Sequence, residues 1–112
     1  MSDEKSYSLF SIHTSSLKKT VFYVIVYDIP DDKRRKRISD LLEGYGSRVQ
    51  YSVFECVLNK QQYKQLCSRL QKIIKLDEDN IRVYPITRHT LEQVETWGVG
   101  NQLTKPPSSI II

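Results

Sequence analysis

The sequence predicts an α+β domain, and three observations support this fold class. Two stretches, Val21–Asp28 and residues 48–58, are rich in the β-branched and aromatic residues that favour strands. The segments that follow them carry apolar residues at helical spacing. The chain has 112 residues, of which 39% are hydrophobic, and this is enough for one compact core. We therefore expect one small domain built from strands and helices.

The first strand is expected at Val21–Asp28, whose sequence VFYVIVYD is apolar in both alternating phases, as in a strand buried on two faces. A helix is expected next, because Asp31 or Asp32 can cap its N-terminus. Gly44 and Gly46 are expected to end this helix. Its apolar face is formed by four residues at helical spacing, which are Ile38, Leu41, Leu42 and Tyr45.

The second half of the chain contains further strand and helix patterns. Residues 48–58 are expected to form one strand, residues 61–75 a helix and residues 81–87 a third strand. Pro85 suggests that the third strand lies at a sheet edge or that the strand ends there. These elements fit the β-α-β-β-α-β order of a ferredoxin-like sandwich if residues 91–97 supply the fourth strand.

The two faces of this predicted sheet differ in what covers them. Both helices lie on one face of a ferredoxin-like sheet, yet the strands here are apolar on both faces. Two copies packed sheet to sheet would bury the uncovered face, so we expect a homodimer. The domain is expected to span residues 21–97, after a polar extension at 1–20. The tail at 98–112 ends in three isoleucines that need a sheet edge, in this chain or in its partner.

Charge and composition limit the class of protein. The net charge of +4 mildly favours a polyanionic partner such as nucleic acid. We see no signal peptide, and no apolar stretch reaches the ~18 residues that span a bilayer. We therefore expect a cytoplasmic protein with reduced thiols and no membrane partner. Cys56 and Cys67 lack the spacing of a metal site or of a redox pair.

Asp28 ends an otherwise apolar strand and has two interpretations. The commoner role of a strand-end carboxylate is to cap a turn. The alternative is a ligand for Mg²⁺, which proteins hold with one or two carboxylates together with water and phosphate oxygens. A single aspartate makes a weak site, but a two-fold dimer would bring two copies together.

A run of basic residues, KRRKR at positions 33–37, opens the first predicted helix. Basic groups gain nothing from the helix dipole at this end, whereas a phosphate-binding role explains their placement. A solvated helix face is the ordinary alternative. Arg35 and Arg48 could hold phosphate oxygens through paired hydrogen bonds. The predicted nucleic-acid contacts are Lys33, Arg34, Arg35, Arg37 and Arg48.

Other side chains give weaker signals. Ser52 could donate a hydrogen bond to a phosphate, although a core hydroxyl is commoner. Phe54 could stack on a base, although a core or interface aromatic is commoner. His13 and His89 are isolated, so the sequence predicts neither a nucleophilic triad nor a zinc site. A glycine-rich phosphate loop is also absent from the sequence.

Two segments together resemble a known family. They are YVIVYDIPDDKRRKRISDLLEGYGSRVQYSVFECVLN at 23–59 and EDNIRVYPIT at 78–87. Both are similar to the CRISPR-associated endoribonuclease family, which partners the CRISPR integrase during spacer acquisition. The joint occurrence of YDI-x-DD-x-x-R-x-R and R-V-Q-Y-S-V-F-E carries the resemblance.

The resemblance implies a ferredoxin-like homodimer whose C-terminal strand joins the partner's sheet. It implies that Asp28 binds the metal opposite its dimer mate. It also implies Mg²⁺-dependent cleavage of RNA or of double-stranded DNA. Six further positions are those linked in the family to nuclease activity or nucleic-acid contact, namely Tyr27, Arg35, Arg37, Arg48, Ser52 and Phe54.

The function predicted from the sequence is a dimeric, nucleic-acid-binding subunit of the CRISPR adaptation machinery with metal-dependent nuclease activity. In this hypothesis Mg²⁺ on paired Asp28 carboxylates lowers the pKa of a bound water, and Arg35 and Arg48 stabilise charge on the phosphate. Tyr27 and Ser52 complete the predicted catalytic set. The alternatives are a non-catalytic DNA-binding subunit that bridges integrase dimers, an RNA-recognition module and a ribonuclease toxin on a related fold.

Overall fold

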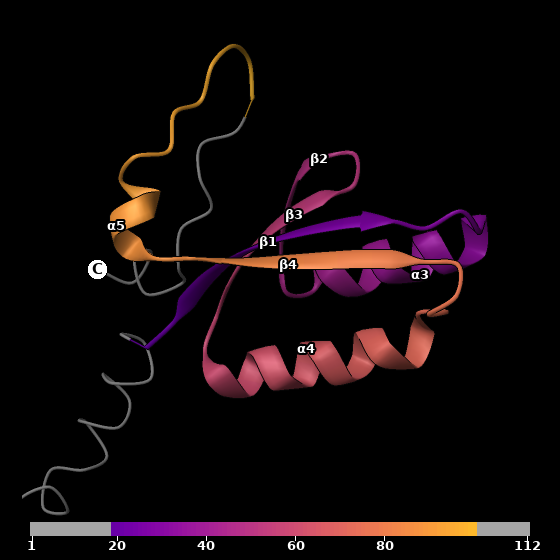
Figure 1. Ribbon diagram of the computed structural model, residues 1–112. Coiled ribbons are helices and arrows are strands. Elements are labelled where there is room, and N and C mark those ends of the chain that lie inside the picture. The colour runs from indigo at the N-terminus through magenta and orange to yellow at the C-terminus, as the bar shows by residue number, and fades with distance from the viewer. Residues whose placement is uncertain (1–18, 101–112) are drawn as a thin grey trace, which may run out of the picture.

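The computed structural model describes residues 19–100 (Figure 1). Within them an antiparallel four-stranded sheet has the strand order β2-β3-β1-β4, and the element order is that of a ferredoxin-like βαββαβ sandwich. This confirms the predicted fold class. The elements are β1 (Val21–Asp28), α3 (Asp32–Glu43), β2 (Gly46–Gln50), β3 (Val53–Leu58), α4 (Lys60–Ile73), β4 (Asn80–Ile86) and α5 (Arg88–Leu91).

Three predictions fall wholly or partly outside residues 19–100. They are the polar extension at 1–20, the isolated His13 and the strand-adding end of the tail at 98–112, including its exchange with a partner. In the part of the chain that the structure describes, no helix is both long enough and apolar enough to cross a membrane.

The strand predicted at 48–58 is in fact two strands. The chain turns at Tyr51 and Ser52, and β2 pairs back against β3 with a register shift between Arg48 and Gln50. The Ser52 carbonyl accepts a hydrogen bond from the Tyr27 backbone N–H at 3.1 Å, which holds the turn against β1. The sequence analysis missed this turn because Tyr-Ser carries none of the usual glycine, proline or asparagine signals.

The predicted position of the fourth strand is also wrong. The fourth strand is β4, and residues 91–97 form no strand. Thr87 caps a short helix directly after β4, since its side chain accepts a hydrogen bond from the Thr90 backbone N–H at 3.1 Å. β4 lies at an edge of the sheet, where Pro85 is tolerated, as its sequence position suggested.

The core lies between the sheet and the two long helices, which cover the same face (Figure 1). Strand residues alternate between faces, so every second residue of β1 and β3 points toward α3 and α4. Burial raises the pKa of the Cys56 thiol to about 11, which makes this thiol a poor nucleophile at neutral pH. The buried core residues of these elements are Tyr23, Ile25, Tyr27, Phe54, Cys56, Leu58, Ile38, Leu42, Leu66 and Leu70.

Local sequence signals place the helix ends. Asp31 rather than Asp32 caps α3, since its Oδ2 accepts a hydrogen bond from the Arg34 backbone N–H at 2.8 Å. Asn59 caps α4 in a reciprocal capping box with Gln62. Gly46 opens β2 because a Cβ there would collide with the neighbouring strand β3. These signals fix where the helices begin and how closely β2 approaches β3.

We call the face of the sheet that lies opposite α3 and α4 the open sheet face. Its residues follow from the antiparallel register, in which directly opposed residues share a face. Tyr84 on this face is 44% exposed, and five of the other residues that β1, β3 and β4 place there are aliphatic. The residues that β1, β3 and β4 contribute to the open sheet face are Phe22, Val24, Val26, Asp28, Val53, Glu55, Val57, Asn80, Arg82, Tyr84 and Ile86.

Candidate functional site

Asp28 is the last residue of β1 and lies on the open sheet face. Its side chain is exposed and makes no hydrogen bond or ion pair within residues 19–100. The following helix is capped by Asp31, so this structure does not use Asp28 as a turn cap. A carboxylate without a protein partner at a strand end is available to an external cation.

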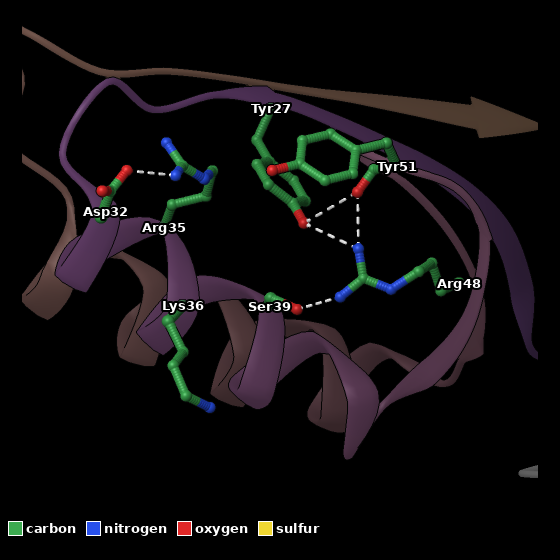
Figure 2. A pocket seen from close by; sticks show the side chains of 7 residues that line it. All are labelled: Tyr27, Asp32, Arg35, Lys36, Ser39, Arg48 and Tyr51. Carbon is green, nitrogen blue, oxygen red and sulfur yellow. Dashed lines mark hydrogen bonds and ion pairs between the residues drawn. The ribbon is translucent and has the colours of Figure 1, made fainter.

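Tyr27 points to the other face of the sheet, because consecutive strand residues alternate. Its ring is buried in the core, and its hydroxyl group borders a cavity of about 210 Å³ (Figure 2). We call this cavity the basic pocket, since three of its seven lining residues are cationic and one is anionic. The lining residues are Tyr27, Asp32, Arg35, Lys36, Ser39, Arg48 and Tyr51.

Arg48 extends from β2 into the basic pocket and is held there by the protein (Figure 2). Its Nη1 donates to the Tyr51 carbonyl oxygen at 2.5 Å and lies 3.5 Å from the Tyr27 hydroxyl. Its Nη2 donates to the Ser39 hydroxyl. The guanidinium also lies 4.9 Å from the centre of the Phe54 ring. These contacts link β1, β2 and α3 and preorganise a positive charge at the pocket.

Arg35 enters the same pocket from α3. Its Nη1 donates to the Ile29 carbonyl oxygen at 2.9 Å and to that of Pro30 at 3.3 Å, and its Nη2 binds the Asp32 carboxylate. The structure therefore brings together three predicted site residues, Tyr27, Arg35 and Arg48. It places Asp28 on the opposite face of the sheet, so the predicted site is divided in two.

Arg34 forms ion pairs within the described residues, and its contact with nucleic acid stays a prediction. Its Nε and Nη2 donate to the Asp79 carboxylate at 2.7 and 2.9 Å, and Nη2 also donates to Glu78 at 2.9 Å. The hydrogen bond from Arg34 lowers the pKa of Asp79 below its ordinary value. Because two carboxylates already occupy this guanidinium, Arg34 joins the start of α3 to the turn before β4.

Phe54 is a core residue, which corrects its prediction as a base-stacking contact. The ring has no exposed surface and packs in the centre of the core, so it cannot reach a base. Ser52 contributes its backbone to the β2–β3 turn. Its half-buried hydroxyl makes no hydrogen bond in the described part of the chain, and its catalytic role stays a prediction.

Two other cationic side chains of the basic run are exposed and available to bind a polyanion. Lys33 and Arg37 are exposed, and neither side chain forms a hydrogen bond or ion pair between residues 19 and 100. They are four residues apart on α3 and so lie on the same helix face. Lys36 differs from them, because it pairs with Asp40 at 3.0 Å.

A complete metal site would need more ligands than the described residues of one chain supply. Among residues 19–100, no three histidine, cysteine, aspartate or glutamate side chains gather into a group that could hold a metal ion. The Asp28 carboxylate is the kind of hard oxygen donor that Mg²⁺ takes, so the donor chemistry fits. One carboxylate per chain leaves the remaining positions to a second copy, water or substrate phosphate.

The sequence analysis missed several residues of the basic pocket. Ser39 lies four residues after Arg35 on α3, and this spacing alone could have placed it beside that arginine. Tyr51 contributes through its backbone carbonyl oxygen, for which the sequence carries no signal. His89, predicted to be isolated, lies in α5. Among the described residues, the hydrogen-bond partner of its imidazole ring is the Gln93 side chain.

The model of one protein family, described as CRISPR associated protein Cas2, matches residues 21–94 of this chain. The chain belongs to the Cas2 family. The resemblance found in the sequence is thereby confirmed. A relative from Synechocystis, named CRISPR-associated endoribonuclease Cas2 3, is 60% identical over 90 residues, which are 80% of this chain and 97% of the relative.

Two solved structures extend the Cas2 comparison to three dimensions. Streptococcus pyogenes Cas2 is 33% identical with a TM-score of 0.61, covering 69% of this chain and 99% of that one. The Cas2-like chain of a partial Cas6-RT-Cas1–Cas2 complex is 38% identical with a TM-score of 0.61, covering 68% of this chain and 89% of that one. Both share the ferredoxin-like architecture described above.

Proposed function

We propose that this Cas2 chain is a nucleic-acid-binding subunit of the CRISPR adaptation machinery that cleaves phosphodiester bonds with Mg²⁺. The proposed metal site forms from the Asp28 carboxylates of two copies in a homodimer. The observation that carries the proposal is the exposed Asp28 carboxylate, which has no partner in residues 19–100. The names of the chain's relatives support nuclease activity, since the Synechocystis protein is called an endoribonuclease.

The open sheet face supports the homodimer. It combines aliphatic residues with the 44%-exposed Tyr84, and α3 and α4 lie on the opposite face (Figure 1). Burying aliphatic surface of this kind is favourable at about 25 cal/mol per Å². A second copy placed over this face would bury these side chains and bring two Asp28 carboxylates into one interface. The dimer and the metal site are therefore linked in this proposal.

The chemistry at phosphorus divides between the metal and the protein. When bound, Mg²⁺ would polarise the phosphate and lower the pKa of a coordinated water. Asp28 would hold and orient the cation from the end of β1. Among the residues that the structure describes, we assign none as the general base. On the opposite face, Arg35 and Arg48 would hold another phosphate of the nucleic acid, which helps to position it.

The substrate class follows from the relatives and from the charge. RNA is the first choice because the relative with 60% identity is named an endoribonuclease. A Cas2-like chain 38% identical to this one belongs to a complex that includes Cas1, and this supports an integrase partner here. Double-stranded DNA is the second candidate, and it fits a subunit that holds DNA between integrase dimers.

The non-catalytic alternative has one specific observation in its favour. The guanidiniums of Arg35 and Arg48 are already engaged by backbone carbonyls and by Asp32 and Ser39, so they act as fixed charges rather than as mobile catalytic groups. Fixed charges of this kind can bind a phosphate without taking part in its cleavage. A purely architectural Cas2 would use them with Lys33 and Arg37 and would have no need for Asp28.

Reversing both free cations, with Lys33→Glu and Arg37→Glu together, is expected to weaken nucleic-acid binding irrespective of sequence. Each lost phosphate contact should reduce the slope of log affinity against log salt by about 0.7 to 0.9, because fewer counterions are released. The measurement is a salt titration of RNA and duplex DNA binding by fluorescence anisotropy.

The matched control carries Lys60→Glu and Lys64→Glu. This pair has the same i, i+4 spacing in the first turns of α4, and both side chains are exposed. It makes the same change in net charge on another helix. If the two double variants give the same affinity and slope, the run at positions 33–37 is only a solvated helix face and the proposed binding surface is wrong.

A further inference from the structure

Asn80 is the first residue of β4 and stands directly opposite Asp28 in the antiparallel register. Opposed residues on one face have Cβ atoms about 4.5 to 5.5 Å apart. Both side chains are exposed on the open sheet face, and neither forms a hydrogen bond or ion pair with any other residue in the described range 19–100. Two unpartnered oxygen-bearing side chains therefore lie side by side at one end of the sheet.

The position of Asn80 is fixed by its neighbour. The Asp79 side chain has no exposed surface, and its Oδ2 accepts hydrogen bonds from Arg34 Nε at 2.7 Å and from the Lys75 backbone N–H at 2.9 Å. The Asp79 backbone N–H donates to the Lys75 carbonyl oxygen at 2.8 Å. These bonds anchor the turn before β4 to the start of α3, so the strand begins at a defined place.

From this geometry we infer that Asn80 is a second metal-binding residue of the chain, acting with Asp28. This inference rests on the proposed function and extends it. The carboxamide oxygen is a hard, neutral donor of the kind that Mg²⁺ accepts, directly or through a coordinated water. In a two-fold dimer, each chain would contribute one carboxylate and one carboxamide. Arg34 and Asp79 are positioning residues, because they fix the strand that carries Asn80 and touch no ligand themselves.

The inference also accounts for the conflict between Arg34 and its sequence context. Arg34 belongs to a basic run that suits phosphate binding, yet two carboxylates neutralise it. An arginine pointing toward Asp28 would repel a cation at that site. Its pairing with Asp79 and Glu78 removes that repulsion and at the same time orders the turn beside Asn80. Arg82 also lies on the open sheet face, two residues after Asn80, and its Nη1 donates to the Tyr84 hydroxyl at 3.3 Å. A cation bound at Asp28 and Asn80 would therefore need the Asp28 carboxylates of both copies to offset the charge of this arginine.

The test measures Mn²⁺ binding to the full chain, since Mn²⁺ takes the same oxygen-rich sites as Mg²⁺ and its free form is quantified by electron paramagnetic resonance. Asn80→Ala should weaken Mn²⁺ binding about tenfold or more, as expected for loss of a supporting ligand. Asn80→Asp should retain or tighten binding, because it replaces one oxygen donor with another. Melting temperature and dimer mass should match those of the unsubstituted chain.

Ser68→Ala serves as the control, since Ser68 is an exposed polar residue of α4 and lies on the side of the sheet opposite the open sheet face. It should leave Mn²⁺ affinity unchanged. If Asn80→Ala binds Mn²⁺ as tightly as the unsubstituted chain while Asp28→Asn does not bind it, the inference fails and the proposed function stands. If the unsubstituted chain binds no Mn²⁺, both fail. If Asn80→Ala does not fold, loss of binding in a folded Asn80→Asp variant overturns the inference instead.

Discussion

Asp28→Asn is expected to lower Mg²⁺-dependent cleavage by two or more orders of magnitude, which corresponds to a barrier higher by about 3 kcal/mol. The substitution keeps the size of the side chain and removes the charge that holds the cation. Folding should survive, because Asp28 is exposed and makes no hydrogen bond within residues 19–100. Nucleic-acid binding should stay the same or improve slightly, since a negative charge near phosphate is lost. The measurement is a single-turnover cleavage rate on RNA and on duplex DNA, with and without Mg²⁺.

Asp77→Asn is the matched control for this comparison. Asp77 is an exposed carboxylate in the turn between α4 and β4 and has no hydrogen-bonding or ionic partner in the described residues. Its variant should cleave at the unsubstituted rate. Cleavage that persists in Asp28→Asn would show that the activity comes from another site or from a contaminant. Cleavage absent from the unsubstituted chain under every metal and pH condition would favour the architectural alternative.

Val24→Asp is expected to weaken the homodimer by about 100-fold or more, equivalent to about 3 kcal/mol. Val24 lies in the middle of β1 on the open sheet face, between Glu55 of β3 and Tyr84 of β4. An aspartate there would bury an unpaired charge in the dimer and would face a like charge at Glu55. The isolated chain keeps its core, because Val24 points away from α3 and α4. Sedimentation equilibrium measures the dimer constant.

Leu76→Asp is the control for the dimer experiment. Leu76 is 87% exposed in the turn after α4. The substitution therefore introduces the same charge away from the open sheet face. Its dimer constant should not change. A chain that stays monomeric throughout the micromolar range without any substitution would contradict the proposed interface. The same dimer constant for Val24→Asp and Leu76→Asp would place the interface elsewhere.

Much of the fold could be predicted because local patterns encode it. Val21–Asp28 is a strand with the predicted bounds, and the two long helices lie where the apolar spacing placed them. Local chemistry also predicted a cap at Asp31 or Asp32 and an edge or strand-end position for Pro85, and the structure uses Asp31 and an edge strand. The turn at Tyr51 and the position of the fourth strand were not predictable in this way, since they depend on pairing with β1 rather than on turn residues.

The candidate site was predicted in its residues but not in its arrangement. Tyr27 and Asp28 are adjacent in the sequence, and strand alternation puts them on opposite faces, a consequence that the motif alone does not reveal. Arg34 pairs with Asp79, 45 positions away, so no local pattern distinguishes it from Arg35. The burial of Phe54 likewise depends on packing between distant elements. Sequence resemblance identified the family, and the structure shows which of the predicted residues line the basic pocket, which pair with carboxylates and which lie in the core.

The central claim is that two Asp28 carboxylates, one from each copy, share one cation. The measurement that tests it most directly is the stoichiometry of Mn²⁺ bound to the purified full chain, determined by native mass spectrometry and calorimetry. The account predicts one ion per two chains and no specific ion in Asp28→Asn. One ion per chain, or a bound ion that persists in Asp28→Asn, would contradict it.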